Sequence, residues 1–182
     1  MDYSSGVWGY KTYSKCDTIQ HRAIRAFLGV HKHASNIVIN GDVGWQTITA
    51  RHHIGMLRLW DRLVKMPGDR LTKRIFNWDF SQNWGWNSEI KHIFELLNLQ
   101  HLFASRSMGN ISLDSLLSRA TDHYKKNDIN KWTQGLETQP KLRTYRQIKH
   151  LYECENYVSM CLPKHLRSFN CTDQNWNLAT TH

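Results

Sequence analysis

The segment TITARHHIGMLRLWDRLVKM, residues 47–66, constrains the fold of this chain more than any other stretch. Its apolar side chains recur at about 100° per residue, which is the period of an amphipathic α-helix. Pro67 and Gly68 follow at once, and the residue before a proline avoids helical angles, so we expect the helix to end there. The apolar arc consists of Ile48, Met56, Leu59, Trp60, Leu63 and Val64.

Shorter helical patterns fill most of the remaining chain. Ser14 is placed to cap a helix that runs to Leu28 and stops at Gly29, and Ser112 is placed to cap a longer one. Further helices are expected at 69–80, 88–99, from Pro140 onward, and in short pieces at 153–161 and 163–169, with one or two turns at 36–43 and a loop at 81–87. The side chains expected to face inward are Ile19, Ile24, Phe27, Leu28, Leu71, Ile75, Phe76, Ile90, Ile93, Phe94, Leu97, Leu117, Ala120, Tyr124 and Trp132, and Ile111 and Leu116 are placed as a hydrophobic staple around the Ser112 cap.

The fold class predicted from these patterns is all-α, because no segment alternates with the period of two that marks a half-buried strand. The 182 residues suit a single irregular multi-helix domain with short loops over residues 1–168, followed by an unstructured, polar tail at 169–182. No apolar run is long enough to span a bilayer, and the start of the chain does not resemble a secretion signal. We therefore expect no membrane association, free cysteines, and an intracellular location, nuclear or cytoplasmic.

The charge of the chain favours a polyanionic partner. The sequence carries 24 Lys and Arg against 15 Asp and Glu, which gives a net charge of +9. Such an excess attracts nucleic acid, RNA or DNA, over long distances. On the helix at 47–66, four cations share one narrow stripe opposite the apolar arc and are predicted to contact phosphates. They are Arg51, Arg58, Arg62 and Lys65.

The stretch PKLRTYRQIKH, residues 140–150, combines a buried face and a basic face in one predicted helix. Pro140 suits its first turn, because the missing N–H would have been unpaired there. Arg143 and Arg146 form a stripe with His150 and are predicted to stay exposed and to bind nucleic acid. The face predicted to be buried consists of Leu142, Tyr145, Ile148 and Tyr152.

An ordered set of blocks in this chain resembles a known family. The blocks YSSGVWGY, IRAFLGV, GDVGWQTITARHHIGMLRLWDRLVKMP and PKLRTYRQIKH resemble the region downstream of the reverse-transcriptase domain in animal non-LTR (LINE-type) retrotransposon polyproteins, from Tyr3 to Ser168. The family's first block reads Tyr-Gly-x-Glu-x-Trp-Gly, whereas Ser4 and Gly6 stand here in place of the glycine and the glutamate. The family also continues into a Cys/His-rich zinc-binding end, and this chain reads FNCTDQNWNLATTH instead. The resemblance therefore implies a truncated or decayed copy.

This resemblance implies a helical, non-catalytic role. In the family, the paired aspartates that hold the polymerase metals lie upstream, and the present chain contains no Asp-Asp pair. Two-metal phosphoryl transfer needs clustered carboxylates, so we expect no enzyme activity, no catalytic residue and no cofactor. The expected partners are nucleic acid and the upstream polymerase domain, if the same element encodes it. The alternative is an inert remnant, or a host-recruited protein-interaction domain that does not bind nucleic acid.

Three other readings of the polar and aromatic residues are weaker. Asp69, Glu89 and Lys91 loosely match the ligands of restriction-like nucleases, but two of them lie in a helical pattern. The spacing of His31, His33, His52 and His53 fits no standard metal site, so these histidines are expected to be at the surface or half-buried. The gaps between Cys154, Cys161, His165 and Cys171 are irregular, and no metal is predicted. Trp8, Trp45 and Trp60 are expected in the core, whereas Trp78, Trp84 and Trp86 either pack in a satellite cluster or stack on bases.

Overall fold

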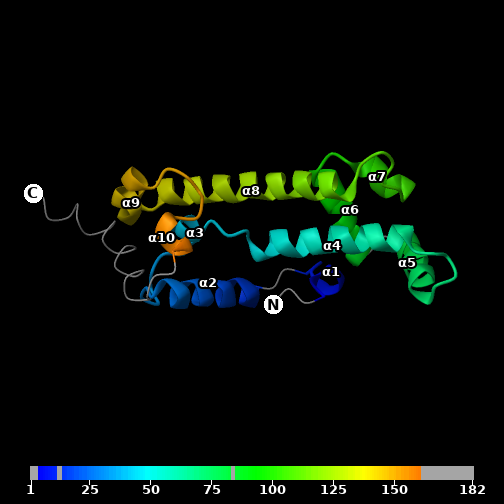
Figure 1. Ribbon diagram of the computed structural model, residues 1–182, viewed down its shortest axis with the longest axis horizontal. Coiled ribbons are helices and arrows are strands. Elements are labelled where there is room, and N and C mark those ends of the chain that lie inside the picture. Colours follow the sequence, from blue (N-terminus) through cyan, green and yellow to red (C-terminus); the bar gives the residue numbers. More distant parts are fainter. Residues whose placement is uncertain (1–3, 12–13, 83–84, 161–182) are drawn as a thin grey trace, which may run out of the picture. The chain divides into compact units, whose positions relative to one another are not determined.

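The computed structural model describes residues 4–11, 14–82 and 85–160, and within these ranges it contains helices and no strand (Figure 1). The all-α prediction is therefore confirmed. The expected helix at 163–169 and the expected tail at 169–182 lie outside the described residues. The chain groups into two compact units, Met1–Tyr13 with Thr47–Lys125 and Ser14–Gln46 with Lys126–His182, and each is described here by itself.

The first unit is built around α4, the helix that the sequence pattern indicated most clearly. The arc of α4 packs with residues of its neighbours into one core that includes Trp60 and Phe94, whose ring centroids lie 4.7 Å apart. Its helices are α1 (Ser5–Trp8), α4 (Ile48–Lys65), α5 (Leu71–Gln82), α6 (Trp86–Leu96), α7 (Gln100–Ser105) and the first part of α8 (Leu113–Thr138).

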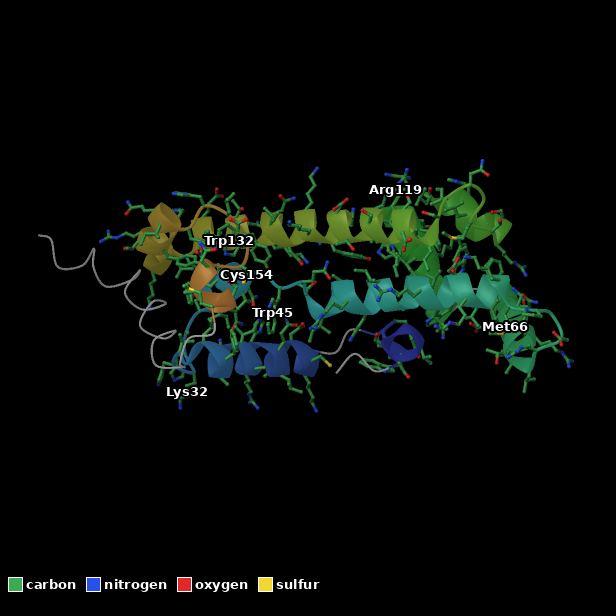
Figure 2. The ribbon with its side chains drawn as sticks, viewed as in Figure 1. Lys32, Trp45, Met66, Arg119, Trp132 and Cys154 are labelled. Carbon is green, nitrogen blue, oxygen red and sulfur yellow. The ribbon has the colours of Figure 1, made fainter. Side chains whose placement is uncertain are left out.

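Local chemistry fixes both ends of α4. The Thr47 hydroxyl accepts a hydrogen bond from the Ala50 amide at 3.4 Å, which is the bond an N-cap makes. At the other end the backbone turns extended at Met66, just before the proline, as predicted (Figure 2). The Lys73 ammonium then donates to the carbonyls of Leu63 and Val64, at 2.8 and 2.9 Å. A cation therefore provides a hydrogen-bond donor for two carbonyl groups in the last turn of α4.

The second unit holds two smaller cores. In one, α2 packs on α3 through Ile24, Leu28, Ile39 and Val43; in the other, Trp132 and Leu136 of α8 pack on α3 and α9 (Figures 1 and 2). Gly29 and Gly44 end α2 and α3 with φ values of 77° and 59°, a backbone conformation that favours glycine. The elements are α2 (Ser14–Leu28), α3 (Asn36–Val43), the rest of α8, the 3₁₀ turn η1 (Pro140–Leu142), α9 (Arg143–Ile148) and α10 (Asn156–Ser159).

Several predicted faces are confirmed. The Ser112 hydroxyl accepts a hydrogen bond from the Ser115 amide at 3.1 Å. Ala120, Tyr124 and Trp132 of α8 are buried as expected, whereas Leu117 is half-buried. Ile90, Ile93 and Phe94 of α6 are also buried. The segment expected to form one or two helical turns is a continuous helix, α3, which includes Gly41.

The predicted inner face of α5 is wrong, apart from Phe76. Leu71 and Ile75 are exposed, because α5 packs on its unit through the opposite side, which carries Lys73, Phe76 and Phe80. Aromatic packing stabilises that side: the centroid of the Phe80 ring lies 4.8 Å from that of the Phe103 ring. In the same way, α2 turns Gln20, Ile24 and Leu28 inward and leaves Ile19 and Phe27 partly exposed, at 45% and 36%.

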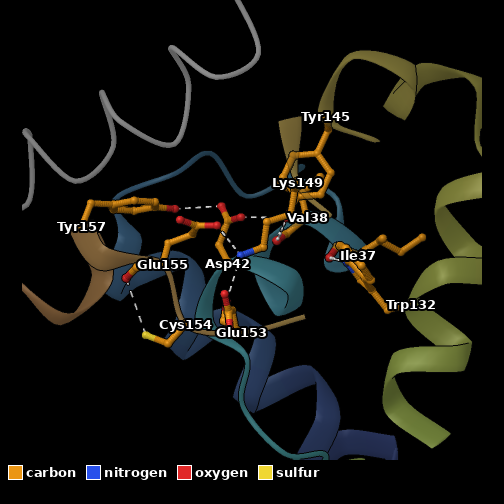
Figure 3. Close-up of polar contacts among 10 residues, drawn as sticks. All are labelled: Ile37, Val38, Asp42, Trp132, Tyr145, Lys149, Glu153, Cys154, Glu155 and Tyr157. Carbon is orange, nitrogen blue, oxygen red and sulfur yellow. Dashed lines mark hydrogen bonds and ion pairs between the residues drawn. The ribbon is translucent and has the colours of Figure 1, made fainter. Parts of the chain in front are cut away.

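The helix predicted from Pro140 is shorter than expected, and this moves its last residues. It ends at Ile148, which is exposed, so the prediction that Ile148 is buried is wrong. Lys149 is buried instead, because its ammonium donates to the Glu153 carbonyl at 2.9 Å and pairs with the Glu155 carboxylate (Figure 3). Leu142 and Tyr145 are buried, and Arg143 and Arg146 are exposed, as predicted.

Three further expectations fail for tertiary reasons. Trp45 is exposed, and its contact to Tyr152 is made by its backbone, in which the carbonyl accepts the hydroxyl at 3.0 Å. His52 and His53 are buried, because α4 is covered on more of its circumference than its apolar arc indicates. The loop expected at 81–87 is shorter, since α5 runs to Gln82 and α6 begins at Trp86.

Candidate nucleic-acid interface

The exposed side of α4 presents basic side chains at intervals of one or two turns. Arg58, Arg62 and Lys65 are exposed, and their positions three and four residues apart place them on one helix face. Arg51 lies on the same stripe but is half-buried, so its side chain is less accessible to a ligand than the sequence pattern predicted. The first unit therefore brings three of the four predicted cations of α4 together.

Lys65 is not a free charge within this stripe. Its ammonium lies 2.8 Å from one oxygen of the buried Asp61 carboxylate and 2.9 Å from the other. The pair spans one helical turn, and the Lys65 side chain remains well exposed. Asp61 thus reduces the charge that Lys65 offers a ligand, and the guanidinium groups of Arg58 and Arg62 carry most of the available positive charge.

These side chains border an open surface hollow of about 520 Å³ at the end of α4. Arg70, in the turn before α5, faces the same hollow and adds a cation that the sequence analysis did not assign to a site. Four of the eight lining residues are basic and one is acidic, so the hollow attracts anions. The lining residues are Arg58, Asp61, Arg62, Lys65, Met66, Pro67, Arg70 and Leu113.

A second, smaller hollow of about 220 Å³ adjoins α4 on the side of α1. It shares Arg58 and Arg62 with the first, so these two arginines lie between the hollows. Sequence reasoning missed it, although Gly55 inside a strong helix was a signal, because such a glycine often marks close approach of another backbone. The lining residues are Ser4, Gly6, Val7, Gly55, Arg58, Leu59 and Arg62.

The other predicted cations lie in the second unit. Arg143 begins α9 and Arg146 lies near its end, both exposed on a helix of six residues. Their neighbour Lys149 is buried and paired with Glu155, so it adds no charge to that surface. Arg143 and Arg146 therefore form a small basic surface of the second unit.

A buried polar network connects α4 to α6 and α8 in the first unit. Nδ1 of His53 lies 2.7 Å from the Tyr124 hydroxyl, and its Nε2 lies 3.5 Å from a Glu89 oxygen. Burial lowers the pKa of His53 from 6.5 to about 4, with smaller contributions from His52 and His92. Burial also raises the pKa of Tyr124 well above its usual value. Neutral His53 therefore links α4 to α8 and α6, which is a structural role.

The residues weighed for metal or nuclease chemistry are not assembled into a metal site in the part of the chain that the structure describes. Glu89 faces His53, while Asp69 and Lys91 are exposed. Cys16 and Cys154 are free thiols; Cys161, His165 and Cys171 lie outside the described residues.

The tryptophans divide between packing and exposure. The Trp86 indole donates to the Gly6 carbonyl at 2.6 Å, and Trp8 packs edge-on against His52, so both are structural. Trp60 is fully buried as predicted, and Trp78 is exposed on α5. Trp84 lies outside the described residues.

Comparison with known proteins gives no assignment. No protein-family model, curated protein or solved structure matches this chain. Within the described residues, no helix is both long and apolar enough to cross a membrane.

Proposed function

We propose that this chain is a non-catalytic helical fragment of a retrotransposon reverse-transcriptase polyprotein that binds nucleic acid without sequence preference. The blocks of sequence described above support the origin. The observation that carries the binding is the gathering of Arg58, Arg62 and Arg70 around one open hollow. An intracellular location, nuclear or cytoplasmic, and an upstream polymerase partner belong to the same proposal.

The geometry of the hollow suits phosphate groups better than bases. Guanidinium groups pair with phosphate oxygens through two parallel hydrogen bonds, and Arg58 and Arg62 stand about 6 Å apart along the helix axis. Contacts of this kind position a nucleic acid and carry no sequence information. The expected ligand is thus a phosphodiester backbone, of RNA or DNA.

One observation favours the alternative, a protein-interaction domain. Leu71, Ile75 and Trp78 are exposed at positions i, i+4 and i+7 of α5, so they form an apolar strip on one helix face. Exposed apolar strips of this kind often mark protein contacts. The alternative predicts that the arginines of α4 are dispensable for the chain's interactions.

Charge reversal on α4 distinguishes nucleic-acid binding from the protein-interaction alternative. Arg58→Glu together with Arg62→Glu should abolish the binding of labelled RNA and DNA strands, measured by fluorescence anisotropy. Lys15→Glu together with Arg22→Glu, two exposed residues of α2 in the other unit, makes the same change in net charge and serves as the control. Circular dichroism should show that both double variants remain helical. Equal loss in both variants would mean that net charge, and not the α4 site, governs binding.

A further inference from the structure

The smaller hollow beside α1 differs in chemistry from the basic hollow at the end of α4. Its walls include Val7, whose side chain is largely exposed, and Leu59, which is half-buried. None of its seven lining residues is acidic. It therefore combines two apolar side chains, Val7 and Leu59, with two guanidinium groups at its border.

Two glycines allow the backbone itself to line this hollow. A Cβ atom on Gly6 would lie 2.8 Å from the Gly55 carbonyl oxygen, and one on Gly55 would lie 2.8 Å from the Ser5 hydroxyl. Any side chain at either position would clash, so α1 crosses α4 with their backbones in contact. The hollow beside this crossing is a slot between two close helices.

The two hollows are arranged in sequence along α4. Because Arg58 and Arg62 border both, a ligand that occupies both hollows must pass over these two side chains. Such a ligand needs an anionic part for the larger hollow and a small uncharged part that can contact Val7 and Leu59 in the slot. A nucleotide has both parts, since guanidinium groups bind phosphate oxygens and also stack on the faces of bases.

The size of the slot limits which nucleotide fits. Its volume of about 220 Å³ is below the roughly 300 to 1,000 Å³ of sites for drug-sized ligands. A single base can enter a space of this size. A base within a duplex is stacked and paired, and it must leave the stack at a cost in free energy before it can enter a side pocket.

We propose that the slot formed by Val7, Leu59 and the Gly6–Gly55 crossing takes one unpaired base, with its flanking phosphates on Arg58 and Arg62. The inference depends on the proposed nucleic-acid function and makes it more specific, because it selects single-stranded nucleic acid over a duplex. Contact of one base with Val7 and Leu59 removes apolar surface from water, and we expect this burial to give about a tenfold difference in affinity.

The test compares two single strands of equal length and charge, an ordinary oligonucleotide and one made of abasic phosphodiester units, by fluorescence anisotropy at fixed salt. The wild-type chain should bind the ordinary strand about tenfold more tightly. Val7→Gln, which places a longer polar side chain in the slot, should bind both strands equally and as weakly as the wild type binds the abasic strand. Leu71→Gln, an equivalent change at an exposed residue outside both hollows, should behave as the wild type.

Different results would contradict the base slot alone or the nucleic-acid binding on which the slot depends. Equal affinity of the wild type for both strands would overturn the base slot and leave phosphate binding standing. An ordinary-strand preference that survives in Val7→Gln would also overturn it. Failure of the wild type to bind either strand would overturn the nucleic-acid function and the slot with it.

Discussion

The Tyr124 hydroxyl lies 2.7 Å from Nδ1 of His53, and this contact joins α8 to α4 inside the first unit. Burial of the His53 ring favours its neutral form, in which Nδ1 can accept from the Tyr124 hydroxyl while Nε2 donates to the Glu89 carboxylate. A charged imidazolium at this position would lose the Tyr124 hydroxyl as a donor. The stability of the unit should therefore depend on pH.

We predict that the free energy of unfolding falls as the pH is lowered from 6.5 to 4. The pKa of His53 is about 4 in the folded chain and 6.5 in the unfolded chain, so in this interval the unfolded chain binds the proton more readily. The loss attributable to His53 is on the order of 3 kcal/mol and is complete below pH 4. Urea unfolding at pH 7, 5.5 and 4 measures it. His53→Gln should flatten this dependence, and an unchanged pH profile in that variant would show that other groups cause it.

Gly41 should tolerate no side chain. A Cβ atom there would lie 2.6 Å from both Nε1 of Trp132 and the Tyr145 hydroxyl, two groups that hydrogen-bond to the backbone of α3. Gly41→Ala should therefore lower the free energy of unfolding by about 1 to 3 kcal/mol, the usual cost of overpacking a core. Gly68→Ala is the matched control, since no atom lies within 4 Å of a Cβ at that position. Equal unfolding midpoints in urea for the two variants would contradict the packing described here.

The two apolar residues of the Pro140 segment should respond differently to truncation. Leu142 is buried in the core formed with Trp132 and Leu136, whereas Ile148 is exposed at the end of α9. Leu142→Ala should cost roughly 2 to 5 kcal/mol, and Ile148→Ala should cost less than about 1 kcal/mol. Chemical denaturation of both variants measures the difference. A larger loss of stability for Ile148→Ala would contradict the exposed position of Ile148 and favour the longer helix that the sequence pattern predicted.

The sequence predicted best where the determinants are local. The extent of α4 depends on its own apolar period, a threonine cap and a following proline, all of which lie within the segment, and the Ser112 cap of α8 is equally local. The packed side of α5 is different. Its sequence offers apolar residues on two opposite faces, and only contacts with Phe103 and neighbouring helices select the face of Phe76 and Phe80.

The candidate site shows the same difference between local determinants, which the sequence pattern reveals, and contacts between distant segments, which it does not. Helical spacing alone grouped Arg58, Arg62 and Lys65, and all three are exposed in the structure. The two hollows could not be predicted, because Arg70 joins the larger one across a turn and α1 closes the smaller one from about fifty residues away. The burial of Lys149 was missed for a similar reason, since its partner Glu155 belongs to the next segment.

The slope of binding affinity against salt concentration tests the central claim most directly. Each phosphate contact removed from a single strand reduces the slope of log K against log salt by about 0.7. Arg58→Gln together with Arg62→Gln should therefore reduce that slope by about 1.4 while the chain remains helical. Lys15→Gln together with Arg22→Gln should leave the slope close to that of the wild type. If the α4 variant keeps the wild-type slope and affinity, Arg58 and Arg62 do not contact phosphates, and the proposed interface is contradicted.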